Sequence, residues 1–313
     1  MRLTNSLILF FLLLLLGHPL QASQSDRPQT SQGWLSFLRG NQSVHVPIVF
    51  VHGIGAGFEK WDKVANHISA GQVSTMRFKD DHTLDYTYQG KAPSVWVWNV
   101  SYYSPQIVEE SLSGNLTLYA ERLEKILQEI TRITSANQFV LVAHSMGGLV
   151  ARKYATLHPS NDQHIAALLT VGTPHEGVPF SFPWVGQLQD LRHGSNFLHD
   201  LDQEWELLIK RHKPKWGVIG GVQFVSTADI REDMTDAGGP GYVQIRSSIP
   251  FGEWKKASSQ LGIPLLNTPH FGFCCAVKAD HNEMLEVPAV YDGIFWAANR
   301  ELGVDHVTTA PAD

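Results

Sequence analysis

The chain has 313 residues, of which 24 are Lys or Arg and 30 are Asp or Glu, so its formal net charge is −6. This balance gives no support for nucleic-acid binding, and the 15 His residues show no zinc-site spacing, so we expect no nucleic acid, no metal and no other cofactor. Hydrophobic residues make up 43% of the sequence, which is enough for a sizeable core in one large α/β domain or two small ones.

The N-terminus has the pattern of a secretory signal peptide. Arg2 precedes an unbroken apolar run over 7–16, and Ala22 offers a small residue for cleavage. The apolar run is short for a membrane span, which favours a cleaved signal peptide. An uncleaved membrane anchor is the alternative. The expected organisation is a signal peptide over 1–22, a polar leader over 23–43 and an exported domain over 44–313.

The first predicted strand, Val44–Val51, leads into a glycine-rich loop that begins His52-Gly53-Ile54-Gly55. Glycines allow a backbone to approach a substrate carbonyl closely. A phosphate-binding loop is disfavoured because no Lys-Ser/Thr pair follows. We expect His52 to hold the turn and not to act as a base.

The next elements alternate in type. Trp61–Ile68 is predicted to be a helix, 72–93 reads as polar and irregular, and Val95–Tyr103 alternates as a strand does. Leu116–Ile133 has apolar side chains at helical spacing and charged ones on the other face, so it should cover a sheet. Strands that alternate with helices indicate a parallel sheet with right-handed crossovers.

A nucleophile elbow is predicted at Ser145. The strand Phe139–Val142 is followed by Ala143-His144-Ser145-Met146-Gly147 and then by helix-periodic sequence. This is the pattern small-x-Ser-x-Gly, placed between a strand and a helix. Such a turn exposes the serine Oγ to solvent and directs the amide of the next residue toward an oxyanion. An ordinary serine in a glycine-rich loop is the alternative, and the flanking strand and helix argue against it.

The run Ala143–Ala155 resembles the lipase branch of the α/β-hydrolase superfamily, some of whose bacterial members also carry Ala at the first position of the elbow. The resemblance extends from about Pro47 to Leu302. It implies an α/β-hydrolase fold, with a mostly parallel sheet flanked by helices and with a cap or lid insertion. It also implies that the amides of Ile54 and Met146 form the oxyanion hole.

An apolar insertion follows the next strand, Ile165–Val171, and we expect it to form the cap over about 178–214. Its aromatic residues are candidate walls of an acyl pocket, although each of them could instead belong to the cap's own core. The substrate-binding candidates are Phe180, Trp184 and Phe197, with Phe182, Leu198 and Trp205 beside them.

The remaining members of a catalytic triad are expected in chain order Ser, acid, His. The strand Trp216–Val225 precedes an acidic loop in which Asp236 is the favoured acid, ahead of Asp233 and Asp229. His281 follows the last predicted strand, Phe271–Val277, and the resemblance makes it the general base. His270 is its nearest competitor.

These residues predict an exported lipase or esterase that hydrolyses an acyl ester or lipid through an acyl-enzyme, with transient contact to a lipid interface. An acyltransferase that uses the same acyl-enzyme and a non-catalytic hydrolase-like binding protein are the alternatives. The acid loop departs from the pattern of lipases that hold calcium, so the resemblance implies no calcium site for this chain and leaves calcium dependence open. Cys274 and Cys275 are adjacent, and we interpret them as small hydrophobic residues of a strand, with a strained disulfide between them or a reactive thiol as the alternative.

Overall fold

The computed structural model describes residues 27–40, 46–80, 82–88, 93–104, 110, 114–179, 186–211, 215–223, 230–236 and 243–299. The signal peptide expected over 1–22 lies outside these ranges. No helix within them is long and apolar enough to cross a bilayer.

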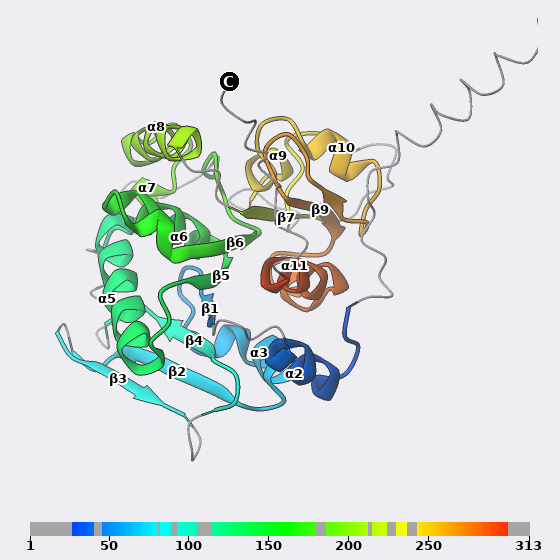
Figure 1. Ribbon diagram of the computed structural model, residues 1–313. Coiled ribbons are helices and arrows are strands. Elements are labelled where there is room, and N and C mark those ends of the chain that lie inside the picture. Colours follow the sequence, from blue (N-terminus) through cyan, green and yellow to red (C-terminus); the bar gives the residue numbers. More distant parts are fainter. Residues whose placement is uncertain are drawn as a thin grey trace, which may run out of the picture.

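Within the described ranges, nine strands form one sheet in the order β3-β2-β4-β1-β5-β6-β7-β9-β8 (Figure 1). The strands pair in parallel except β3 and β8, which are antiparallel and lie at the two edges. The predicted α/β fold with a mostly parallel sheet is therefore confirmed. The strands are β1 (Ile48–Val51), β2 (Val73–Phe78), β3 (Leu84–Thr87), β4 (Val97–Ser101), β5 (Phe139–His144), β6 (Ile165–Val171), β7 (Trp216–Val222), β8 (Leu265–Leu266) and β9 (Phe273–Lys278).

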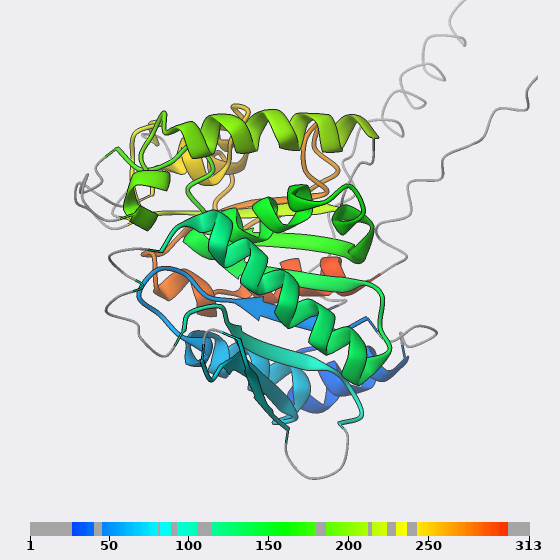
Figure 2. The same cartoon turned by 90° about the vertical axis from the view of Figure 1, so that its left-hand side faces the viewer.

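Helices cover both faces of the sheet, as Figures 1 and 2 show from two sides. The central strands are buried on both faces, so alternate residues of β1 belong to two separate cores: Val49 and Val51 to one, Ile48 and Phe50 to the other. The first core includes α5 (Leu116–Thr134), α6 (Met146–Leu157) and α8 (Asn196–Arg211). The second includes α2 (Ser31–Gly40), α3 (Asp62–Ser69) and α11 (Pro288–Ala298).

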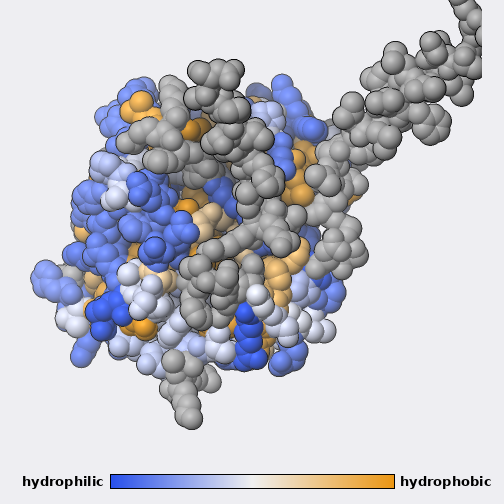
Figure 3. All heavy atoms as spheres, viewed as in Figure 1, coloured by the Kyte–Doolittle hydropathy of each residue, from blue (hydrophilic) through white to orange (hydrophobic). Residues whose placement is uncertain are grey.

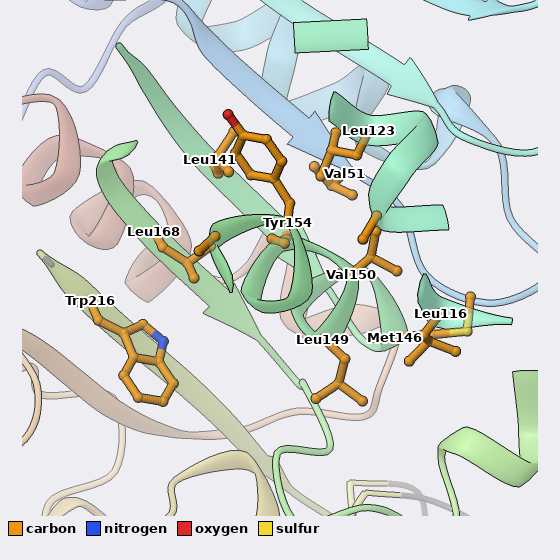
Figure 4. Packing of buried hydrophobic residues seen from close by; sticks show 14 of the residues in the cluster. Val51, Leu116, Leu123, Leu141, Met146, Leu149, Val150, Tyr154, Leu168 and Trp216 are labelled. Atoms are coloured by element: carbon orange, nitrogen blue, oxygen red, sulfur yellow. The ribbon is translucent and has the colours of Figure 1, made fainter. Parts of the chain in front are cut away.

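Helix α6 lies at the centre of the first core. Figure 4 shows its Val150 and Tyr154 beside Val51 of β1 and Leu123 of α5. Even Met146, the first residue of the helix, is fully buried. The element that follows the elbow is thus anchored by packing along its length.

In the space-filling view, hydrophilic side chains dominate the side formed by α5 and α6, and apolar ones gather toward the middle of the visible face (Figure 3).

The expectation of an irregular segment over 72–93 is wrong, because this range contains β2 and β3. The two strands pair as an antiparallel hairpin at the sheet edge, with Met76 opposite Tyr86. On β2 the buried residues are Ser74, Met76 and Phe78. A small polar residue on the inward side hides the alternation that would otherwise indicate a strand.

Part of the predicted leader, 23–43, belongs to the folded domain. Helix α2 buries Trp34 completely, and this ring lies 6.3 Å from Phe295 of α11. Upstream of the helix, Arg27 Nε contacts Asp292 Oδ1 at 2.7 Å. The domain therefore begins before residue 44.

The predicted cap contains α7 (Gly186–Asp190) and α8 within the described residues. Helix α8 joins the sheet-covering layer and does not stand apart from it, because its Leu201 and Trp205 are buried in the first core. Polar contacts fix it on α6: Arg152 donates to Asp202 at 2.8 Å and Lys153 to Glu204 at 2.7 Å. This part of the insertion is a packed flanking helix.

Cys274 and Cys275 lie on β9 and are both fully buried free thiols. Their side chains belong to the two different cores, as expected of neighbours on a doubly covered strand. Burial raises the pKa of the Cys275 thiol to about 12, which keeps it protonated and unreactive.

Candidate active site

Ser145 stands in a strained turn between β5 and α6. Its φ and ψ are 55° and −131°, so a residue with a Cβ is held in the half of conformational space that normally favours glycine. Neighbouring backbone closes around it. A Cβ on Gly53 would lie 2.7 Å from Ser145 Cβ, and one on Gly147 would lie 2.3 Å from the carbonyl oxygen of His52. The elbow is built only because both positions lack side chains.

The side chains of Ser145, His281 and Asp236 form a continuous hydrogen-bonded row. Ser145 Oγ lies 2.9 Å from His281 Nε2, and His281 Nδ1 lies 2.5 Å from Asp236 Oδ2. Asp236 is fully buried, and its other oxygen accepts from the amide of Val243 at 3.1 Å. Both oxygens of the carboxylate are therefore used, one to fix the loop and the other to orient the imidazole.

The other candidates for the acid and the base do not contact Ser145 or His281 among the described residues. Asp233 is exposed and pairs with Arg231 at 3.2 Å, and Asp229 lies outside the described residues. His270 is exposed and contacts Glu253 at 2.7 Å. Among the described candidates, only Asp236 and His281 are brought to Ser145.

The loop that carries His281 is held from two directions. The carboxylate of Asp280 accepts from the amides of Asn282 and Glu283 at 2.8 and 2.7 Å, which forms a local cap. From the elbow, the Nε2–H of His144 donates to the carbonyl of His281 at 2.8 Å. Burial lowers the pKa of His144 well below its usual value, so its ring is neutral and serves as a fixed donor.

The glycine-rich loop after β1, His52–Gly57, which is the predicted oxyanion loop, is oriented through His52. Ser101 Oγ lies 3.0 Å from His52 Nε2, and His52 Nδ1 donates to the carbonyl of Gly53 at 2.7 Å. Burial lowers the pKa of His52 to about 4, so the neutral ring persists at neutral pH. The carbonyl of Gly53 and the amide of Ile54 belong to one trans peptide and point in opposite directions. Holding the carbonyl therefore sets the direction of the Ile54 N–H.

The amides of Ile54 and Met146 donate to no other described residue. Met146 is the first residue of α6, where an amide has no acceptor within its own helix. The helix dipole adds partial positive charge at this end. Both amides are thus available to an acceptor from outside the described part of the chain.

Of the three predicted substrate-binding residues, the structure describes one, Phe197. Phe180, Phe182 and Trp184 lie outside the described residues. Phe197 is on α8, where it lines a separate groove of about 690 Å³ together with Lys153 and Glu204, and no triad residue lines that groove. Within the described residues, no group of three or more His, Cys, Asp or Glu side chains could hold a metal ion.

Two residues that hold the site were not predicted from the sequence. His144 donates to the backbone carbonyl of His281, and Ser101 fixes the ring of His52. Both lie at the carboxyl ends of parallel strands, β5 and β4, that flank β1. Polar residues at that edge of a parallel sheet are the signal that could have found them.

Comparison with known proteins agrees with this architecture. GPI inositol-deacylase of Candida albicans is 28% identical over 151 residues, which are 46% of this chain and 34% of that protein. Triacylglycerol lipase of Pseudarthrobacter phenanthrenivorans is 27% identical over 135 residues, 43% of this chain and 35% of the lipase. The chain thus spans about a third of the length of these curated relatives.

The crystal structure of the product of gene lin2722 from Listeria innocua superposes with a TM-score of 0.51 at 15% sequence identity, covering 82% of this chain and 94% of that one. At this identity the likeness concerns the fold. The PGAP1-like alpha/beta domain family matches residues 42–253, a range that includes Ser145 and Asp236. The chain therefore belongs to the PGAP1-like α/β domain family, within the α/β-hydrolase superfamily.

Proposed function

We propose that this protein is a serine hydrolase that cleaves carboxylic esters of acyl or lipid substrates through a covalent acyl-enzyme. The observation that carries the proposal is the row from Ser145 through His281 to buried Asp236, with spacings of 2.9 and 2.5 Å. Nucleophile, base and orienting acid are here in hydrogen-bond contact. The hydrolase family and the lipase-like fold make an ester a natural target of such a row.

In the acylation half-reaction, Ser145 Oγ attacks the ester carbonyl carbon while His281 Nε2 takes its proton. Asp236 keeps the imidazole in the tautomer whose Nδ1 carries hydrogen, and it stabilises the imidazolium that forms. The carbonyl oxygen becomes an oxyanion, to which the amides of Ile54 and Met146 donate. The C–O bond then breaks, and His281 returns its proton to the departing alcohol.

In the deacylation half-reaction, water replaces the alcohol. The oxygen of the water molecule bonds to the acyl carbon while His281 accepts a proton from the water. The same two amides donate to the second oxyanion. Collapse of this intermediate breaks the bond to Ser145 Oγ, which regains its proton from His281. The products are a carboxylic acid and free enzyme.

The substrate class is inferred from the relatives. One is named a deacylase and the other a triacylglycerol lipase, and both names denote removal of acyl groups. We extend that chemistry to this chain as a proposal, with transient contact to a lipid surface. Export behind a cleaved signal peptide is also a proposal, and N-terminal sequencing of the mature protein, expected to begin at Ser23, tests it.

Labelling with a fluorophosphonate probe tests the chemistry. The wild-type protein should react, and Ser145→Ala and His281→Ala should not, while His270→Ala serves as the matched histidine control and should label normally. Failure of the wild-type protein to label in both buffer and detergent micelles would contradict the proposal. Product analysis with an added alcohol separates hydrolysis from transfer, because a new ester would mark an acyltransferase.

A further inference from the structure

The oxyanion loop contains three glycines within five residues, Gly53 to Gly57, and such a backbone has little intrinsic rigidity. An oxyanion donor is effective only when it is already aimed at the place where charge develops. The peptide that precedes the Ile54 Cα is held at its carbonyl by His52. The peptide that follows the same Cα needs a second attachment.

Tyr103 provides this attachment. The amide of Gly55 donates to the Tyr103 hydroxyl at 3.3 Å, and the same hydroxyl donates to Gln187 Oε1 at 3.0 Å. Burial raises the pKa of Tyr103 to about 12, so the phenol keeps its proton and can serve both partners at once. The ring is fixed by Tyr102 and Tyr119, whose centroids lie 5.0 and 5.2 Å away.

Gln187 belongs to α7, the short helix of the insertion. Its side chain is 2% exposed, and α7 is itself fixed on α5, because Asp190 Oδ2 accepts from the amide of Leu116 at 2.9 Å. The phenol of Tyr103 thus connects the oxyanion loop to the inserted helix. A displacement of α7 would withdraw the acceptor from this hydroxyl.

We propose that Tyr103 is a positioning residue that aims the Ile54 amide and couples it to the seating of α7, so that the oxyanion hole is complete only when this part of the insertion is in place. This inference rests on the proposed hydrolase function. Tyr103 acts through the Gly55 amide and does not touch the reacting atoms.

Steady-state kinetics on a soluble ester tests the inference with Tyr103→Phe and Gln187→Met, which remove the hydroxyl and the acceptor at nearly constant volume. Each should lower kcat by about tenfold with little change in KM, since displacing a reacting group by about 1 Å costs up to about a hundredfold. The pH dependence of kcat/KM should stay as in the wild type, because His281 is untouched. The double variant should be no slower than the slower single variant, because both changes break one connection.

Tyr119→Phe is the matched control. Its hydroxyl donates to the carbonyl of Glu110 at 3.1 Å within the same aromatic cluster, so it removes a phenol without loosening the oxyanion loop, and kcat should be unchanged. Wild-type kcat in Tyr103→Phe would overturn the inference and leave the hydrolase proposal standing. Additive losses in the double variant would overturn the coupling to α7. Absence of Ser145-dependent turnover in the wild-type protein would overturn both proposals together.

Discussion

The proposed nucleophile, Ser145, and its proposed base, His281, are held by different means. Ser145 is fixed by packing, because the backbone around Gly53 and the buried helix α6 close around it. His281 and Asp236 instead lie on loops after β9 and β7, each held by a few directed hydrogen bonds. Substitutions around Ser145 should therefore cause steric clashes and lower the stability of the fold. Substitutions around His281 and Asp236 should instead disturb the geometry of the site and lower the reaction rate, with the stability nearly unchanged.

Asp236→Asn should show the largest effect on rate. The amide keeps an acceptor for Val243 but favours the wrong tautomer of His281, so kcat should fall by about 10⁴-fold with a melting temperature near that of the wild type. Steady-state kinetics and calorimetry measure the two quantities. Asp233→Asn, on the same loop but exposed, should change neither, and an equal loss in that variant would refute the assignment of the acid.

Gly147→Ala should show the largest effect on stability. The added methyl meets the carbonyl oxygen of His52 at 2.3 Å and that of Val51 at 3.1 Å, and neither belongs to a flexible side chain. We expect a loss of about 1–3 kcal/mol or more in the free energy of unfolding, measured by urea denaturation, together with weaker probe labelling. Gly40→Ala, where no atom lies within 4 Å, is the control and should be neutral.

The buried histidines make stability depend on pH. The pKa of His52 is about 4 in the folded protein and about 6.5 when unfolded, so between these values only the unfolded chain takes up the proton. Stability should therefore fall as pH drops from about 6.5 to 4, by about 3 kcal/mol for this residue. In His52→Asn the slope of unfolding free energy against pH should decrease across that window. His82 is exposed, so His82→Asn is the control and should leave this slope as in the wild type. If His52→Asn also kept the wild-type slope, His52 would not be the source of the pH dependence.

The smallest effect is expected at His144, which joins the two regions. His144→Phe removes the donor to the His281 carbonyl and should lower kcat by about tenfold, with KM nearly unchanged. His144→Gln retains an N–H and should recover part of that loss. Equal rates for the two variants would show that the hydrogen bond does not position the base.

The sequence predicts the packed region better than the hydrogen-bonded one. The elbow is local, since a buried strand, small residues and a helix start follow one another directly along the chain. The order of the triad identified candidates for the acid and the base, but several residues competed for each role. The tertiary structure brings Asp236 to His281 and leaves Asp233 exposed. This choice between the two carboxylates depends on the pairing of Thr235 with Gln244, which the sequence does not reveal.

The errors in the fold have similar causes. The edge hairpin of β2 and β3 was missed because buried Ser74 interrupts the apolar alternation. Helix α2 was taken for a leader because the partner of Trp34, Phe295, lies at the other end of the chain. Contacts between segments far apart in sequence leave no local pattern to read.

That last contact sets an order of events during synthesis. A chain that is made, or threaded through a membrane pore, from its N-terminus presents α2 first and α11 only after every strand of the sheet has appeared. Until then Trp34 lacks its ring contacts with Tyr291 and Phe295 of α11, and the second core is incomplete. The second core can therefore be completed only after α11, the last helix of the described residues, has been made.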